Sequence, residues 1–261
     1  MNDMQKNIRE YWYAWIYDRE EDVSEIAAHL VRELGDRPLR VLEAACGGGK
    51  LSVPLAEAGH DVTGFDRDEH MLRHAAARAE NLPNLHIRRA DLLTEAWGSG
   101  YDAVILGANL MVNLVTDRDY KRAQKNLLDR AYDALKPGGV LLMDYDCPLD
   151  VAKWTPANRE WVCFEGTDDR GTYGRYIVVN GPVNNSTRTV SGKRRWEMKP
   201  ADGEAFTVVT DSYKHFPTLE ETCAWLYRIG LTIEAVRGGY NGEPFDKDHR
   251  RAVIRARKMP V

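Results

Sequence analysis

The chain has 261 residues, 43% of them hydrophobic and 29% charged, and a net charge of −4. Such a length suits one medium-sized domain or one domain with a sizeable insertion, and it buries a core without disulfides. The acidic balance excludes a general nucleic-acid binder, because neutralising phosphates requires a basic excess. With no apolar run of about 18 residues and a polar N-terminus, we expect neither a membrane segment nor a signal peptide. The cysteines lack CxxC spacing and predict a reducing, cytoplasmic location: Cys46, Cys147, Cys163 and Cys223.

Two helical stretches are predicted first. Residues 2–17 are rich in aromatic side chains, and residues 22–34 repeat apolar side chains at helical spacing. The pattern then alternates between buried strands and helices. We expect strands over 40–45, 61–65, 85–90, 101–107 and 140–145, and helices over 51–58, 69–79 and 117–135. Strands that alternate with helices indicate parallel βαβ units in a doubly wound α/β sheet, with ligand sites at the carboxyl ends of the strands.

The rhythm changes after residue 146. Period-two segments between residues 161 and 213 predict three or four antiparallel strands, with turns at 184–185 and 201–203. A helix is predicted over 219–229, with Thr218 as its N-cap and Glu221 at the capping-box position. Two last strands are predicted over 231–240 and 250–258. The expected domain boundaries are 1–35 for a helical cap, 36–148 with 214–261 for the core, and 149–213 for an antiparallel lid.

A glycine-rich stretch, EAACGGG over residues 43–49, joins the first predicted strand to a predicted helix. Small residues let a backbone turn tightly against a ligand, and the helix N-terminus offers N–H groups. A triphosphate-binding loop would need GxxxxGK[ST], but the leading glycine and the Ser/Thr after Lys50 are missing. A dinucleotide-binding loop would need GxGxxG, and Lys50 occupies the place of its last glycine. The pattern present is (D/E)-x-(G/A)-x-G-x-G.

This loop resembles that of the class I S-adenosylmethionine-dependent methyltransferases. Further segments resemble the same family in order and spacing: VTGFDRDEHML, IRRADLLT, YDAVILGANL and LKPGGVLLMDY. The resemblance covers about residues 36–146 well and both flanks more loosely. It implies a Rossmann-like seven-stranded doubly wound sheet whose last strand is antiparallel, with an N-terminal helical cap and an antiparallel β insertion after strand 5.

The resemblance also implies S-adenosyl-L-methionine as cofactor and S-adenosyl-L-homocysteine as its product. Asp66 would accept hydrogen bonds from both ribose hydroxyls, and Glu43 would face the charged amino group. Asp91 would accept from the adenine amino group, and Leu92 would donate its backbone N–H to the ring. The remaining cofactor residues of the core would be Ala45, Gly47 and Gly49 in the loop, Arg67 and Met71 beside the adenine, and Gly107 beneath the methionine part.

Within the family, the layout is most similar to small-molecule N-methyltransferases of the glycine N-methyltransferase and amino-sugar N,N-dimethyltransferase kind. These share an ACG-type loop, an aromatic N-terminal helix that closes over the cofactor and an insertion after the fifth strand. By this resemblance Tyr17 would cap the cofactor, with Tyr11 and Trp15 next. The chain departs from the family's LGNSxxHL segment at Ala108 and Asn113, so the acceptor does not carry over.

The acceptor side is predicted to lie after the fourth and fifth strands. Asp144, Tyr145 and Asp146 would face the acceptor pocket, where a carboxylate could hold an ammonium group or accept its proton, or else cap the next turn. Asn109 belongs to the same predicted edge, and His215 is the histidine near the lid that could serve as a base for an oxygen acceptor. His70 and His74 lack the HExxH order, so we expect no metal.

The sequence therefore predicts a methyltransferase that acts on a small molecule, most readily an amine nitrogen. An O-methyltransferase of a hydroxylated metabolite and a non-catalytic cofactor-binding protein stay open. We expect a small-molecule acceptor as partner, no nucleic acid and no membrane, and a homodimer stays open.

Overall fold

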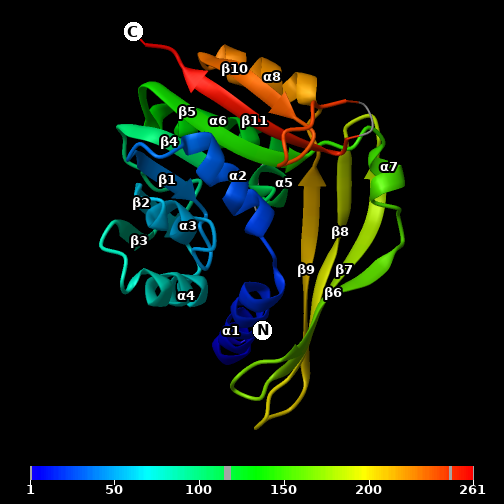
Figure 1. The fold of residues 1–261 in the computed structure, drawn as a ribbon. Coiled ribbons are helices and arrows are strands. Elements are labelled where there is room, and N and C mark those ends of the chain that lie inside the picture. The colour runs from blue at the N-terminus through cyan, green and yellow to red at the C-terminus, as the bar shows by residue number, and fades with distance from the viewer. Residues whose placement is uncertain (1, 115–118, 247–248, 261) are drawn as a thin grey trace. The chain divides into compact units, whose positions relative to one another are not determined.

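The computed structural model describes residues 2–114, 119–246 and 249–260, and Figure 1 shows their course. Contacts within the chain divide it into two compact units. The insertion unit comprises Met1–Asp22 and Asp150–His215, and the sheet unit comprises Val23–Leu149 and Phe216–Val261. No helix of the described ranges is both long and apolar enough to span a membrane.

The sheet unit contains a seven-stranded sheet. Its strands are β1 (Arg40–Ala44), β2 (Asp61–Asp66), β3 (Leu85–Arg89), β4 (Tyr101–Leu106), β5 (Leu135–Asp146), β10 (Leu231–Arg237) and β11 (Arg251–Lys258), in the spatial order β10-β11-β5-β4-β1-β2-β3. Strand β11, red in Figure 1, runs antiparallel to both of its neighbours, β5 and β10. The pairs among β5, β4, β1, β2 and β3 are parallel. The predicted Rossmann-like sheet with an antiparallel last strand is confirmed.

Helices connect these strands and bury their apolar sides against the sheet. They are α2 (Ser24–Leu34), α3 (Ser52–Glu57), α4 (Glu69–Ala79), α5 (Leu110–Asn113), α6 (Tyr120–Ala134) and α8 (Leu219–Arg228). Ile26 and Leu30 of α2 and Leu55 of α3 belong to one buried cluster with residues of β1, β2, β4 and β5. Helix α6 contacts β4 and β5 and also packs on α8.

Local signals place two of these helices as predicted. Helix α8 begins with the expected capping box: the Thr218 side chain accepts from the Glu221 N–H, and the Glu221 side chain accepts from the Thr218 N–H. Helix α4 spans the predicted residues, and its N-cap Asp68 accepts from the N–H groups of His70 and Met71. The predicted helix over 117–135 is present as α6, and its first two predicted residues lie outside the described part of the chain.

The insertion unit is a four-stranded antiparallel sheet joined by the first helix. Its elements are α1 (Asp3–Glu20), α7 (Val151–Trp154), β6 (Glu160–Thr167), β7 (Tyr173–Asn184), β8 (Thr189–Lys199) and β9 (Phe206–His215). The strands pair in chain order, β6-β7-β8-β9. Trp12 and Ile16 of α1 are buried in one cluster with Tyr176, Trp196 and Met198 of this sheet. The indole of Trp12 donates to the Gly166 carbonyl oxygen at 3.0 Å.

Some boundaries differ from the predicted ones. Strand β5 already begins at Leu135, because Leu135 pairs with Tyr101 before a register shift, and Gly138 at φ 81° lies inside the strand rather than in a separate turn. The short helices α5 and α7 were not predicted, since four residues give no helical period. The contact division also separates the two helices of the expected 1–35 cap: α1 belongs to the insertion unit and α2 to the sheet unit.

Candidate functional site

The loop after β1 has the backbone that its small residues predict. Ala45, Gly47 and Gly49 have φ values of 56°, 52° and 78°, a left-handed conformation in which glycine carries no steric penalty. A Cβ at Gly47 would meet no heavy atom within 4 Å, so this side of the loop is open. A Cβ at Gly49 would lie 3.3 Å from Ala75 of α4, so the other side of the loop is closely packed against this helix. The loop thus presents bare backbone on one side only.

Glu43 is the last but one residue of β1, shortly before this loop. Its side chain is 4% exposed and accepts a hydrogen bond from the Ser52 hydroxyl at the start of α3. Burial raises the pKa of Glu43 to about 8, although the Ser52 hydroxyl and N–H favour the charged form, and the nearby Asp66 adds to the rise. A buried carboxyl group of this kind is poised to ionise when a cation binds beside it.

Asp66 ends β2, the neighbour of β1 in the sheet. Its carboxylate accepts from the Gly47 N–H at 3.0 Å and from the Asp68 N–H at 2.9 Å, so the acid and the glycine loop fix each other. Burial raises the pKa of Asp66, and these N–H groups partly offset the rise. Arg67 beside it is more than half exposed, and one of its guanidinium nitrogens lies 3.9 Å from Asp91.

The segment after β3 is held by its own acid. Asp91 accepts from the N–H groups of Leu93 and Thr94 and from the Thr94 hydroxyl through one oxygen, Oδ1. Burial tends to raise the pKa of Asp91, but these donors outweigh it and the pKa is lowered. The Leu92 carbonyl accepts from the Trp97 indole at 3.1 Å. Met71 is buried on α4.

Gly107 follows β4, on the other side of β1. A Cβ there would lie 2.7 Å from a methyl group of Leu51, so any larger residue would require the Leu51 side chain to move. Because β1, β2 and β4 are parallel neighbours, their carboxyl ends meet at one edge of the sheet. The structure therefore brings together Glu43, the glycine loop, Asp66 and Gly107 as the sequence predicts, and Asp91 lies one strand further along.

Polar side chains gather where β4 and β5 end. Asn109 adopts φ 61°, its N–H donates to Asp144 at 3.1 Å, and its side-chain amide donates to Asp146 at 2.8 Å and accepts from the Asp146 N–H at 2.8 Å. Arg251 of β11 reaches both carboxylates, at 3.5 Å from Asp144 and 3.0 Å from Asp146. Burial raises the pKa of Asp144, while Arg251 and the Tyr240 hydroxyl favour its charged form.

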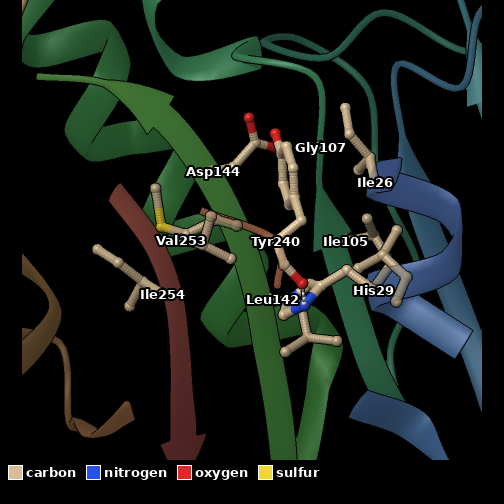
Figure 2. Close-up of a pocket in the computed structure, with 11 residues that line it drawn as sticks. Ile26, His29, Ile105, Gly107, Leu142, Asp144, Tyr240, Val253 and Ile254 are labelled. Carbon is tan, nitrogen blue, oxygen red and sulfur yellow. Dashed lines mark hydrogen bonds between the residues drawn. The ribbon is translucent and has the colours of Figure 1, made fainter. Parts of the chain in front are cut away.

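Tyr240 and Arg251 were missed by the sequence analysis. Tyr240 lies between β10 and β11, and its hydroxyl accepts from Arg251 at 2.8 Å. Figure 2 shows its ring pointing toward Asp144 across a small pocket of about 10 Å³, room for about one water molecule. The pocket lining includes His29 and Ile26 of α2 and Gly107. No local pattern around residues 240 and 251 marked either side chain.

Tyr145 is not brought together with Asp144. Successive strand residues point to opposite faces, and the fully buried Tyr145 donates its hydroxyl to the Thr218 carbonyl at 3.2 Å before α8. Donors of the chain itself surround the Asp144 carboxylate. The expected contacts of Asp144 and Tyr145 with an acceptor stay predictions.

The remaining predicted residues belong to the insertion unit. The Tyr11 hydroxyl donates to Asp169 at 2.7 Å, and the Arg170 guanidinium lies 3.4 Å from the Tyr11 ring centroid. Tyr17 stacks with Tyr13 at 5.9 Å between ring centroids. The Arg19 guanidinium lies 4.5 Å from the Trp15 ring centroid. His215, the last residue of β9, is 1% exposed. Their predicted contacts with a cofactor or acceptor stay predictions.

Comparison with known proteins finds matches to part of the chain. Residues 41–139 match a family described as a methyltransferase domain. The chain is 34% identical over 145 residues to glycine/sarcosine N-methyltransferase from Halorhodospira halochloris, which covers 52% of each protein. It is 37% identical over 124 residues to ubiquinone biosynthesis O-methyltransferase from Ruegeria pomeroyi, covering 44% of this chain and 46% of the relative. The chain thus spans about half the length of the curated relatives it matches.

Among solved structures, the fold resembles the amino pentose methyltransferase CalS10 from Micromonospora echinaspora, determined with S-adenosylmethionine bound. The match has a TM-score of 0.60 at 18% identity and covers 99% of this chain and 98% of the other. At that identity the likeness concerns the fold. It extends over both units of the chain.

Proposed function

We propose that this chain, which belongs to the class I S-adenosylmethionine-dependent methyltransferases, transfers a methyl group to a small molecule, most readily to an amine nitrogen. One observation carries the proposal: the open, left-handed glycine loop is fixed by Asp66 and comes shortly after the buried Glu43.

The cofactor fits this edge on three counts. The face of Gly47 that a side chain would fill is open, so backbone can lie against a ligand. Asp66 offers carboxylate oxygens to paired hydroxyls, as a ribose presents them. Glu43 is a buried acid able to ionise opposite an ammonium group. When bound, S-adenosylmethionine supplies an electrophilic methyl group, and the chain's own residues bind, orient and exclude water.

Methyl transfer to a nitrogen demands mainly position. The acceptor lone pair must approach the methyl carbon in line, at about 3 Å, and holding two reactants in that geometry supplies much of the rate enhancement. No nucleophilic side chain is required. At the ends of β4 and β5, two carboxylates, Asp144 and Asp146, face one guanidinium, Arg251, an acidic balance that suits a basic acceptor.

A hydroxyl acceptor is the second candidate. The Ruegeria relative is an O-methyltransferase, and its match is of the same strength as that of the N-methyltransferase. An alcohol of high pKa would need a firmer base than a neutral amine does. The expectation that His215 serves as that base, like the cofactor contacts of Tyr11, Trp15 and Tyr17, remains a prediction.

Product analysis with methyl-labelled S-adenosylmethionine tests the proposal. The purified protein is offered matched panels of primary and secondary amines, amino sugars among them, and of hydroxylated analogues that lack the amine. We expect label in an amine product together with formation of S-adenosylhomocysteine. Label in hydroxyl products alone would select the second candidate. Tight binding of S-adenosylhomocysteine without turnover on either panel would instead support a non-catalytic binding protein.

A further inference from the structure

The turn between β4 and α5 has a strained backbone. Ala108 and Asn109 both adopt positive φ, 55° and 61°. Asparagine tolerates this region, but an alanine Cβ collides with the backbone there, so this conformation is unfavourable for alanine. Such a conformation persists only where surrounding groups hold it. The turn directly follows Gly107, which packs closely against Leu51. A shift of the turn would therefore move Gly107, the residue expected beneath the cofactor.

Two carboxylates from β5 supply that hold. Asp144 accepts the N–H of Asn109 at 3.1 Å and also the N–H of Ala108, so consecutive amides of the turn end on one carboxylate. Asp146 grips the Asn109 side chain at both ends, donating its N–H to the amide oxygen and accepting from the amide nitrogen, each at 2.8 Å. Asp144 is 3% exposed and Asp146 is 8% exposed.

Two buried carboxylates on one strand repel each other and lose hydration, so they require a compensating cation. Arg251 provides it. Its Nε and Nη2 donate to Asp146 at 3.1 and 3.0 Å, and its Nη1 lies 3.5 Å from Asp144. The same Nη1 donates to the Tyr240 hydroxyl at 2.8 Å, and that hydroxyl hydrogen bonds to Asp144.

The Tyr240 backbone is tied down separately. Its carbonyl oxygen accepts from Arg32 of α2 at 2.6 Å and lies 3.2 Å from a ring nitrogen of His29. Tyr240 is thereby fixed to α2 through its backbone, and its phenol is fixed between Arg251 and Asp144. Figure 2 shows the Tyr240 ring extending toward Asp144. Tyr240 and Arg251 therefore connect β10 and β11 to the turn between β4 and α5.

We propose that Arg251 and Tyr240 are positioning residues, which hold the Ala108–Asn109 turn in its strained conformation through Asp144 and Asp146. This role rests on the proposed function, in which Gly107 lies beneath the methionine part of the cofactor. Because the turn directly follows Gly107, its conformation determines where that part of the cofactor binds. Neither residue needs to touch the cofactor or the acceptor.

Hydrogen exchange and ligand titration together test this role. The variants are Tyr240→Phe, which removes only the hydroxyl, Arg251→Lys, which keeps the charge without the fork, and Arg251→Met. The matched control is Arg255→Met. Arg255 lies on the same strand with similar exposure, and its ion pairs are with Glu234 and Glu33, outside the group. S-adenosylhomocysteine is the titrated ligand.

For Tyr240→Phe and Arg251→Met we expect the amides of residues 107–110 to exchange about tenfold faster than in the unaltered protein, with the rest of the sheet protected as before. Their affinity for S-adenosylhomocysteine should fall by about tenfold or more, with partial recovery in Arg251→Lys. The control should change neither quantity. If Arg251→Met fails to fold, Tyr240→Phe decides alone.

Unchanged exchange at residues 107–110 in Tyr240→Phe, or a loss of affinity equal to that of the Arg255 control, would overturn the positioning role. If the unaltered protein does not bind S-adenosylhomocysteine at all, the proposed function fails. The exchange measurement then still decides whether these two residues hold the turn.

Discussion

Among the residues of the site, Glu43 has a strongly raised pKa. Its pKa is raised to about 8 by burial, so the carboxyl group is mostly protonated at neutral pH in the free protein. Burial favours the neutral form of Glu43 in the folded state. The contribution of this raised pKa to the free energy of unfolding is therefore fully present below the ordinary pKa of 4.5, and it is lost as the pH rises through about 8. A bound ammonium group reverses the preference.

We therefore expect binding of S-adenosylhomocysteine to release a proton from Glu43 at neutral pH, and its affinity to rise with pH until it levels off near pH 8. Calorimetric titration in two buffers with different protonation enthalpies measures the proton released. Glu43→Gln keeps a partner for the Ser52 hydroxyl and should abolish the release. Equal proton release in the unaltered protein and in this variant would show that Glu43 does not face the ammonium group.

Tyr145 provides a residue-scale contrast to Asp144. Its hydroxyl donates to the Thr218 carbonyl on the side of α8. Tyr145→Phe should therefore lower the free energy of unfolding by about 1 kcal/mol, the usual net value of such a hydrogen bond, and leave affinity for S-adenosylhomocysteine unchanged. Denaturant unfolding and calorimetry measure the two. A Tyr145→Phe variant with full stability and weakened ligand binding would instead show that Tyr145 contributes to the binding site.

At the scale of elements, the packing of α1 on its sheet depends on a glycine. A Cβ at Gly174 of β7 would collide with the Trp12 indole, and Trp12 is fully buried. Gly174→Ala should destabilise the insertion unit by roughly 1–3 kcal/mol, because α1 must move or the indole must leave its rotamer.

Limited proteolysis within residues 150–215 and thermal melting measure this effect. Val209→Ala on β9, where the side chain is 53% exposed, serves as the control and should stay within about 0.5 kcal/mol. A Gly174→Ala variant as resistant to protease as the control would mean that α1 is not held by this contact.

Elements with local signals were predictable from the sequence. The alternation of apolar runs and amphipathic helices gave the parallel part of the sheet, and Thr218 with Glu221 gave the start of α8. Helices α5 and α7 are too short to show a period, and the start of β5 at Leu135 depends on pairing with Tyr101, which lies in another segment. Pairings of that kind are set by the tertiary structure.

The site divides in the same way. Glu43 and Asp66 lie at the carboxyl ends of β1 and β2, and Gly107 follows β4 directly, so the rule for carboxyl ends of parallel strands places them together. Arg251 lies 105 residues from Asp146, and no spacing in the sequence connects them. Asp144, Tyr145 and Asp146 end β5, and the period of two in a strand places the Tyr145 side chain on the face opposite to the two carboxylates, which the sequence analysis did not use.

For the whole molecule, each of the two units contains a hydrophobic cluster within its described residues. The glycine loop, Asp66 and Glu43 all belong to the sheet unit. The cofactor contacts proposed for them can therefore be tested by substitutions within that unit alone. Residues of the insertion unit with predicted roles, such as Tyr17, remain to be tested by substitution.

The central claim is that the carboxyl edge of the sheet binds S-adenosylmethionine, with Asp66 as acceptor for the ribose. Calorimetric titration of S-adenosylhomocysteine into Asp66→Asn and into the control Asp61→Asn tests it most directly. Asp61 lies at the opposite end of β2, and its side chain is about half exposed. We predict an affinity loss of about tenfold or more for Asp66→Asn and none for Asp61→Asn, because hydrogen bonds to a charged acceptor contribute about 1.5–3 kcal/mol. Equal affinity in both variants and the unaltered protein would contradict this placement of the cofactor.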